Sequence, residues 1–407
     1  MTVTTRHAGR WTLEDRCASA WHYLPVEVPA GCWGMRVELT YDRSAATLDL
    51  GCLGPDGFRG WSGGARGSFV ISAHGATPGY LPGELEPGLW QVIIGIYRVP
   101  LAGVEYELTV HLARSEGELR ADPPPGPPPP GPRERPTRRE LPAGDGRRWL
   151  AGDLHTHTVH SDGALTVPEL ACLAVGQGLD FLAVTDHNTI SHHAELPANS
   201  ARYAITLLPG QEVTVDTGHA NVFGDVGWVD FRTSPDDWLA HARRRGGLMS
   251  VNHPIAGHVS WMLQMRDRPP LVEVWHWSWL DPHWTTPLAW WRAWDADAIP
   301  VGGSDWHRAG ADGLVGTPTT WVECEGSGPD AVLAGLRAGR VAVSAGRDGP
   351  VLLRLGGELI AVDAEGTVLT GPDGPRARVT GPLASFPAHV GSHRLTDATG
   401  ATLALTA

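Results

Sequence analysis

The sequence predicts an α/β protein in which a barrel of parallel strands and helices lies between two β-rich parts. Short runs rich in β-branched and aromatic residues fill residues 1–115, and strand-like runs alternate with helical stretches over residues 148–325. Short strands return in residues 326–407. Alternating strands and helices indicate parallel pairing with crossover helices, whereas regular short strands indicate an all-β domain. The chain of 407 residues has room for several such domains.

The first part predicts a β-sandwich or jelly roll. Its strand-like runs include GMRVELTYD and LWQVIIGIY, and turn signals such as GPDG separate them. Residues 57–67, GFRGWSGGARG, are too rich in glycine for a strand, so we expect a loop that exposes Trp61 and Arg66. Tyr80 lies in a second such loop. We expect the domain to dock on the barrel through these loops, with Trp61 or Arg66 near the substrate.

Residues 116–147 are predicted to form a linker. They contain the run PPPGPPPPGPRERPTRR, which is too dense in proline to continue a sheet or a helix. Such a segment forms an extended and semi-rigid polyproline spacer.

The part from 148 to 325 carries the barrel pattern. WLAGDLHTH precedes the helical stretch VPELACLAVGQG, and about seven strand-like runs follow one another up to TTWVEC. From 326 onward, DAVLAGLRAG predicts a short helix, and VLLRLGG, ELIAVDA, TVLTG and ARVTG predict short strands. We therefore expect a small β-rich extension at the end of the chain.

The composition excludes several classes of protein. The chain has 45 acidic and 32 basic residues, a net charge of −13, so a strongly basic nucleic-acid footprint is absent. No apolar run approaches the ~20 residues of a membrane helix. The five cysteines are scattered without a CxxC pair, which favours a reduced compartment. We expect a cytoplasmic protein without a membrane segment.

Histidine placement carries the strongest functional signal. In DLHTH, residues i and i+2 of an extended strand face the same side, so His155 and His157 present two imidazoles to one point. Asp162, in the following SDG, adds a hard oxygen ligand. This combination predicts a metal site.

Four more clusters follow later strand-like runs. They are TDHN with Asp186 and His187, Glu212 with His219 in GHANVFG, NHP with His253, and GGSDWH with Asp305 and His307. Each lies at the carboxyl end of a predicted strand. All βα loops of a parallel barrel open on that face, so these side chains should meet there.

These motifs resemble the PHP (polymerase and histidinol phosphatase) superfamily. GHANVFG and the N-terminal β domain are more similar to the CehA/McbA-type metallohydrolases within it. The resemblance covers about residues 148–325. It implies a distorted (β/α)7 TIM-like barrel with two or three divalent metal ions, commonly Mn, Fe or Zn. Such proteins mostly hydrolyse phosphoesters, and some of the subgroup cleave carbamates or amides.

The resemblance also implies a set of metal ligands. The first metal would be held by His155, His157, Glu212 and Asp305; Glu212 would bridge to a second metal held with His219 and His253; and Asp162, His187 and His307 would hold a third.

The ligands predict the chemistry. Two cations that share a carboxylate hold a bridging water and lower its pKa, which supplies hydroxide at neutral pH. The sequence therefore predicts a metal-dependent phosphoesterase acting on a phosphomonoester, phosphodiester or cyclic phosphate. The alternative is a metal-dependent hydrolase of carbamate, amide or carboxylic ester bonds in an aryl substrate. A binding module built on a decayed barrel is disfavoured, because every expected ligand position is filled.

Three further residues are candidates for catalysis. Asp186 precedes His187, a predicted metal ligand, and would orient that ligand or act as a base. The alternative is that Asp186 only accepts hydrogen bonds from backbone groups. Arg308 and His276 are candidates for gripping phosphate oxygens. Twelve of the 18 tryptophans lie between Trp228 and Trp321. They predict either an aromatic pocket, for a small molecule with an aromatic or base-like group, or packing against the N-terminal domain.

Overall fold

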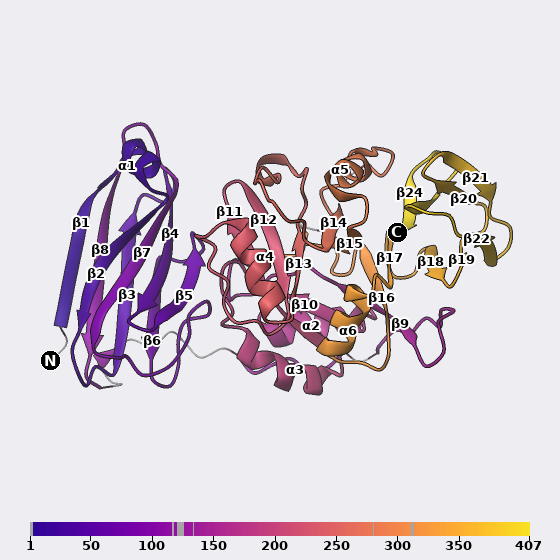
Figure 1. The fold of residues 1–407 in the computed structure, drawn as a ribbon. Coiled ribbons are helices and arrows are strands. Elements are labelled where there is room, and N and C mark those ends of the chain that lie inside the picture. Colours follow the sequence, from indigo (N-terminus) through magenta and orange to yellow (C-terminus); the bar gives the residue numbers. More distant parts are fainter. Residues whose placement is uncertain (1–2, 116–117, 120–125, 133, 280, 311–312) are drawn as a thin grey trace. The chain divides into compact units, whose positions relative to one another are not determined.

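The computed structural model describes residues 3–115, 118–119, 126–132, 134–279, 281–310 and 313–407. It divides the chain into two compact units (Figure 1). The first comprises Met1–Pro127 with the short segments Val159–Asp162 and His187–His192. The second comprises Pro128–Thr158, Gly163–Asp186 and His193–Ala407. None of the described helices has the length and apolar composition needed to cross a membrane.

The first unit contains two four-stranded antiparallel sheets. One has the order β1 (Val3–Trp11), β8 (Val104–Ala113), β3 (Gly34–Tyr41) and β6 (Ser68–Ser72). The other has the order β2 (Trp21–Val28), β7 (Gly88–Arg98), β4 (Thr47–Gly54) and β5 (Gly57–Gly63). Side chains from both sheets, such as Met35 and Trp90, share one hydrophobic core. A short helix, α1 (Leu13–Ala18), follows β1 and begins at a capping box formed by Thr12 and Asp15.

The glycine-rich segment after Asp56 forms a strand, so the predicted loop is wrong for Gly57–Gly63. The missing side chains make room for aromatic rings. A Cβ atom at Gly51 would lie 2.4 Å from Trp61 Cε3, and one at Gly60 would lie 2.2 Å from Tyr80 Cδ1. Trp61 and Tyr80 are therefore buried, at 4% and 2% exposure, and not exposed as the sequence predicts.

The second unit is built on one 13-stranded mixed sheet of described residues. Its order is β15 (Ile299–Gly303), β14 (Leu271–His276), β13 (Leu248–Val251), β12 (Gly218–Phe223), β11 (Thr206–Val215), β10 (Phe181–Val184), β9 (Arg148–Asp153), β16 (Thr319–Cys324), β17 (Val341–Ser344), β24 (Thr402–Thr406), β23 (His393–Thr396), β20 (Val368–Gly371) and β21 (Gly374–Arg378).

This sheet differs from the all-parallel barrel that the sequence predicts. β9, β10 and β11 pair in parallel, as do β13, β14 and β15, but β12 and β16 are antiparallel to both of their neighbours. Only Asp216 and Thr217 connect β11 to β12, and so short a connection permits antiparallel pairing only. Between β16 and β15, Thr320 Oγ1 accepts a hydrogen bond from Gly302 N at 2.8 Å and donates one to Gly302 O at 2.7 Å.

Within the described residues of the second unit, five α-helices connect strands. They are α2 (Val167–Gly176), α3 (Leu196–Tyr203), α4 (Pro235–Arg244), α5 (Thr286–Asp295) and α6 (Pro329–Arg337). Each has proline in its first two positions, where the missing N–H costs nothing. Two short 3₁₀ turns, His193–Glu195 and Gly257–Val259, complete the helical segments.

The end of the chain is β-rich, but it continues the main sheet. After α6, strands β17, β24, β23, β20 and β21 extend that sheet, and β18 (Val351–Leu355), β19 (Glu358–Val362) and β22 (Leu383–Pro387) form a separate three-stranded sheet. Leu352, Leu359 and Leu395 join the two sheets in one small core.

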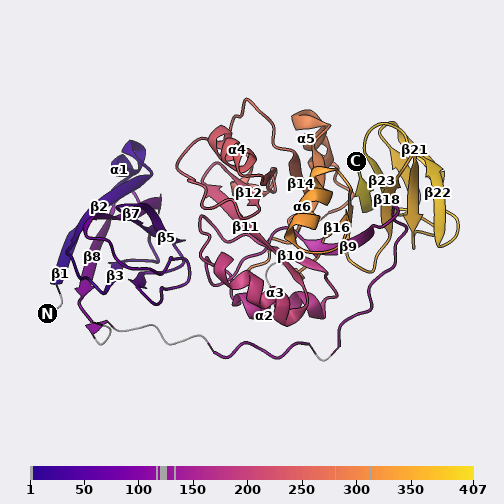
Figure 2. The same ribbon diagram turned by 60° about the horizontal axis from the view of Figure 1, so that its bottom comes forward.

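The described part of the proline-rich segment has no helix or strand up to β9, and Figure 2 shows it as an extended trace. From Pro128 it belongs to the second unit. Arg135 and Arg138 lie 3.5 and 2.7 Å from the buried carboxylate of Asp180, and the Tyr203 hydroxyl donates to Pro129 O. These contacts attach residues 129, 135 and 138 to other parts of the second unit. Residues 116–117, 120–125 and 133 of the predicted linker lie outside the described residues.

Candidate metal centre

The carboxyl end of β9 positions the first pair of histidines. Thr156, between them, forms a parallel bridge with Trp306, and His157 N donates to Trp306 O at 3.0 Å. The extended backbone turns both imidazoles the same way, and both are fully buried. Asp153 holds this corner: its carboxylate accepts backbone hydrogen bonds from His155, Ser304 and Gly316.

Glu212 of β11 is the common neighbour of four imidazoles. Its Oε1 lies 3.2 Å from His155 Nε2, 3.2 Å from His219 Nδ1 and 3.4 Å from His253 Nε2. Its Oε2 lies 3.5 Å from His157 Nε2. The side chain of Glu212 is fully buried, and Asn252 Nδ2 donates to Oε1 at 2.9 Å. One carboxylate therefore faces ring nitrogens from β12 and from the ends of β9 and β13.

Asp305, two residues beyond β15, is the second carboxylate of this cluster. Its Oδ1 lies 3.1 Å from His155 Nε2 and 2.9 Å from His157 Nε2, and its Oδ2 lies 3.1 Å from His276 Nε2. Asp305 has φ of 49°, a left-handed conformation that is uncommon outside glycine. Such strain collects at functional sites, where the surrounding contacts hold the residue in place.

Glu273 of β14 is a third carboxylate, which the sequence analysis missed. Its Oε1 lies 3.0 Å from His155 Nδ1, and its Oε2 accepts from His253 N at 2.8 Å. The register between β14 and β15 shifts between Glu273 and Trp275, so regular alternation is broken there. This irregularity lets Glu273 and His276 both reach the cluster. The sequence does contain a signal for Glu273, which is the one acidic residue inside the apolar run LVEVWH. A buried carboxylate needs partners, so an acidic residue in such a run indicates a polar site.

His276 joins the cluster through Asp305. Ser278 N donates to His276 Nδ1 at 3.1 Å, so Nδ1 is an acceptor and the ring proton lies on Nε2, toward Asp305 Oδ2. His276 is 5% exposed. The structure thus places this predicted phosphate-gripping residue against a predicted metal ligand.

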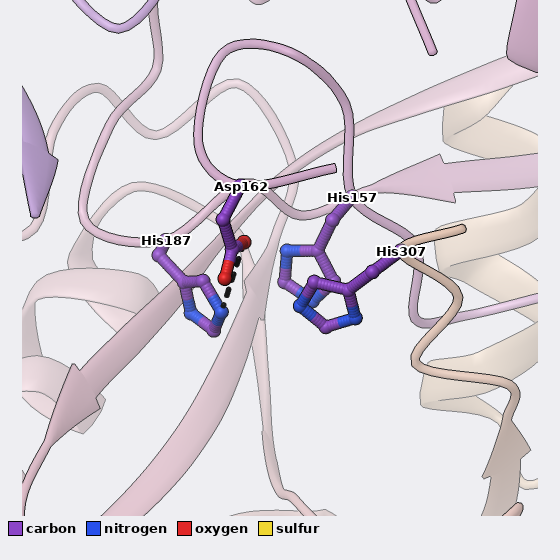
Figure 3. A group of neighbouring side chains, drawn as sticks. All are labelled: His157, Asp162, His187 and His307. Carbon is purple, nitrogen blue, oxygen red and sulfur yellow. Dashed lines mark ion pairs between the residues drawn. The ribbon is translucent and has the colours of Figure 1, made fainter. Parts of the chain in front are cut away.

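A further group contains His157, Asp162, His187 and His307, which could hold a metal ion (Figure 3). His187 Nε2 lies 3.6 Å from Asp162 Oδ1. The His157 and His307 rings stack at 4.2 Å between centroids. His307 Nδ1 donates to Asp305 O at 2.8 Å, which leaves Nε2 as its ligand atom.

The other two catalytic candidates lie differently. The carboxylate oxygens of Asp186 accept from Thr158 N at 2.8 Å and Thr158 Oγ1 at 2.7 Å, so a backbone N–H is one of the partners of Asp186. Asp186 is in none of the candidate ligand groups of the described residues. Arg308 is exposed and also outside these groups.

Electrostatics couples the members of the cluster. Burial disfavours the His155 cation, but the carboxylates of Asp305, Glu212 and Glu273 outweigh it and raise the pKa of His155 well above its ordinary value. Burial also disfavours the Asp305 carboxylate, but His155 and the other rings hold its pKa well below its usual range. In a metal complex the cation takes the place of these protons, so binding would release them.

The donor set fits divalent metal ions. The candidate groups are His155, His157, Glu212 and Asp305; Glu212, His219 and His253; His155, His253 and Glu273; and His253, His276 and Asp305, each with ligand atoms within 4.8 Å of one another. Buried His155 Nε2 has no well-formed hydrogen bond among the described residues, although oxygens lie 3.1 and 3.2 Å away. Nitrogen and carboxylate ligands without thiolate suit Mn, Fe and Zn alike.

The tryptophan-rich run packs mainly within the second unit. Trp275, Trp279 and Trp291 share a core with Val343 and Leu405, so they fill the space beside β14, α5 and the last strands. Trp277 is 38% exposed, and its ring centroid lies 5.4 Å from that of His276.

A comparison with known families matches the part of the chain that holds several of these histidines. Residues 153–224 match the PHP domain. That segment contains six of the nine predicted metal ligands: His155, His157, Asp162, His187, Glu212 and His219.

Curated relatives match short stretches of the chain. A 3',5'-nucleoside bisphosphate phosphatase of Chromobacterium violaceum is 43% identical over 70 residues, which is 17% of this chain and 25% of that protein. A 5'-3' exoribonuclease of Haemophilus influenzae is 38% identical over 64 residues, which is 16% of this chain and 23% of that protein. The chain thus spans about a quarter of the length of the curated relatives it matches.

Among solved structures, a two-domain protein of Bacteroides vulgatus aligns with 68% of this chain and 99% of its own length. It is described as containing a predicted PHP-like metal-dependent phosphoesterase. The two chains are 17% identical, with a TM-score of 0.43.

Proposed function

We propose that the chain is a metal-dependent phosphoesterase of the PHP superfamily, of the CehA/McbA type, with two or three divalent ions at the histidine–carboxylate cluster. The observation that supports this proposal best is the position of Glu212. Its two carboxylate oxygens lie 3.2 to 3.5 Å from ring nitrogens of four imidazoles. The names of the curated relatives, a nucleoside bisphosphate phosphatase and an exoribonuclease, support phosphate-ester chemistry. The GHANVFG motif, which forms β12, supports the subtype.

The ligands would be the predicted nine residues: His155, His157, Asp162, His187, Glu212, His219, His253, Asp305 and His307. When bound, ions of this kind act as Lewis acids toward a phosphoryl oxygen and lower the pKa of a water molecule. Mn, Fe and Zn each suit the donor set.

The chain's own residues orient these ligands. Glu273 contacts His155 Nδ1 and accepts from the His253 backbone, so it holds the His155 ring and the backbone of His253 in place. Ser278 fixes the tautomer of His276, whose Nε2–H holds Asp305 Oδ2. Carboxylates and hydrogen bonds behind a ligand set its orientation and basicity, so these contacts preorganise the site.

The substrate would be a small phosphomonoester, phosphodiester or cyclic phosphate with an aryl or base-like group. The half-exposed Trp277 beside His276 offers such a group a stacking surface. Exposed Arg308, next to His307, would grip phosphate oxygens. The same aromatic surface suits an aryl carbamate or ester, which is the alternative substrate.

A substrate panel tests the proposal. The protein loaded with Mn, Fe or Zn is assayed with p-nitrophenyl phosphate, a bis-aryl phosphodiester, adenosine 3',5'-bisphosphate, aryl esters and aryl carbamates. We expect turnover of phosphate esters that disappears on chelation and returns with metal. Turnover of esters or carbamates alone would establish the alternative. No turnover by protein that holds stoichiometric metal would refute both.

A further inference from the structure

A second candidate site lies between α5 and the strands that end the chain, within the second unit. It is a cavity of about 210 Å³. Its lining comes from α5 with its preceding turn and from β20, β21, β23 and β24: Thr285, Leu288, Ala289, Trp291, Arg292, Thr370, Gly371, Pro372, Gly374, Ser392, His393, Arg394 and Leu405. None of these residues is a metal ligand of the proposed centre.

The cavity is lined by cations without counterions. Arg292 and Arg394 border it, and no aspartate or glutamate is among the lining residues. Within the described residues, no ion pair joins a carboxylate to either arginine; Arg394 Nη1 donates to a neutral partner, Thr402 Oγ1, at 3.2 Å. Burial, and after it the Arg292 guanidinium, lowers the pKa of Arg394, which indicates that the two cations are close.

A buried histidine adds a neutral ring to the lining, because burial lowers the pKa of His393 to about 4. His393 is 1% exposed, and its Nε2 makes no hydrogen bond among the described residues. A Cβ atom at Gly371 would lie 3.4 Å from that nitrogen, so Nε2 faces the wall that Gly371 contributes to the cavity. Arg376, whose Cδ would lie 2.9 Å from the same Cβ, has a buried Nη1 that likewise lacks a partner in the described part of the chain.

The remaining walls set the size and polarity of a ligand. Thr285, Thr370 and Ser392 offer hydroxyls, and Leu288, Trp291 and Leu405 offer an apolar surface. Two guanidinium groups, each able to donate two parallel hydrogen bonds, match a phosphate group better than a monoanionic carboxylate. The volume leaves room for a small organic part beside the phosphate.

We propose that this cavity binds the phosphate group of a small molecule, held by Arg292, Arg394 and His393. The inference is independent of the proposed hydrolysis, because it uses no metal and no metal ligand. The ligand is either free phosphate or a small phosphomonoester, and the two share the anionic group that the arginines would recognise.

Calorimetric titration of the full chain, with chelator present throughout, tests the site. Inorganic phosphate, glycerol 3-phosphate and acetate are titrated in turn. We expect one phosphate site per chain, weakened about 10-fold or more in R292Q/R394Q, because charge-assisted pairs are lost. Tighter binding of glycerol 3-phosphate than of phosphate would identify a phosphomonoester as the occupant, and the reverse order would identify free phosphate.

Matched variants distinguish this site from other sources of binding. Arg378→Gln changes an exposed arginine of β21 outside the cavity lining, and it should leave the affinity unchanged. Gly371→Ala, which adds a methyl group beside His393, should weaken binding. Circular dichroism checks that each variant is folded. Unchanged affinity in R292Q/R394Q, equal loss in Arg378→Gln, acetate binding as tight as phosphate, or a phosphate site lost only in His155→Ala would overturn the proposal.

Discussion

The histidine–carboxylate cluster and the arginine-lined cavity lie in the same unit but have opposite electrostatics. In the cluster, the buried carboxylates of Glu212 and Glu273 and the partly buried carboxylate of Asp305 lie among imidazoles whose own protonation depends on them. In the cavity, Arg292 and Arg394 have no carboxylate among their neighbours in the lining. Arg292 is exposed and Arg394 is half-buried, and a cleft lined by one sign of charge attracts ligands of the opposite sign. The first region suits cations and the second suits anions.

The two regions also differ in how the chain assembles them. The cluster uses residues within or just beyond neighbouring strands, so its members follow one another along the sequence at strand intervals. The cavity combines α5 with strands that begin some 70 residues later, such as β20. A site of the first kind leaves motifs in the sequence, whereas one of the second kind becomes visible only in the folded structure.

The largest loss of turnover and metal affinity should come from replacing a proposed metal ligand that contacts several other members of the cluster. His155→Ala or Asp305→Ala is expected to abolish turnover. Each should also lower metal affinity by at least the 10–100-fold that is typical when a residue hydrogen-bonded to a metal ligand is replaced. Metal content after dialysis and kcat with saturating metal measure the two effects. His74→Ala, at an exposed position of the first unit, is the matched control. Full kcat in a metal-replete His155→Ala would contradict the ligand assignment.

A smaller loss of metal affinity should follow from Glu273→Gln. The amide keeps the shape but removes the charge that contacts His155 Nδ1 and the His253 backbone, so we expect metal affinity to fall about 10-fold to 100-fold. Calorimetric metal titration measures this directly, without reliance on activity. Glu325→Gln, at an exposed glutamate, should bind metal as the unaltered chain does. Equal affinity in both variants would show that Glu273 does not position the ligands.

Glu273 and His276 also show where sequence reasoning reaches its limit. The HxH spacing predicts two inward rings because a regular strand alternates faces, and His155 and His157 lie as expected. The same rule fails at β14, because the register shift after Glu273 is a property of pairing with β15, and the sequence of one strand does not reveal it. A residue beside such an irregularity, as Glu273 is, is therefore difficult to predict from the sequence.

Fold prediction failed in places with a comparable local cause. The mixed α/β character was predicted, but the antiparallel β12 was not, although the two-residue connection Asp216-Thr217 already excludes a crossover. Gly57–Gly63 was assigned to a loop because glycine disfavours strands in isolation. In the structure, Trp61 and Tyr80 pack over the glycines, so tertiary contacts outweigh the local propensity.

A moderate effect is expected at the rim of the cluster. Trp277→Ala removes the exposed ring beside His276, so KM for an aryl phosphate should rise about 5-fold, consistent with the loss of one aromatic contact. The kcat should change little, and KM for glycerol 3-phosphate should stay constant. Trp284→Ala, at another exposed tryptophan, is the control. Equal rises in KM for both substrates would mean that Trp277 shapes the site and does not stack on the substrate.

The smallest effect concerns the pH dependence of stability, where the two regions should again differ. Burial, and after it the nearby Arg354 and Arg376, lowers the pKa of His393 to about 4, whereas carboxylates raise that of His155. Between pH 4 and the ordinary histidine value near 6.5, unfolded chains take up a proton at residue 393 that folded chains do not. This contribution to stability is complete above about pH 6.5 and is lost as the pH falls toward 4. We expect His393→Gln to show a smaller fall in the thermal midpoint between pH 7 and pH 4.5 than the unaltered chain, by a few degrees. Phosphate should raise the midpoint of the unaltered chain but not that of R292Q/R394Q, since a ligand of the folded state stabilises only a chain that binds it. Identical pH profiles for His393→Gln and the unaltered chain would show that His393 takes up its proton equally in both states.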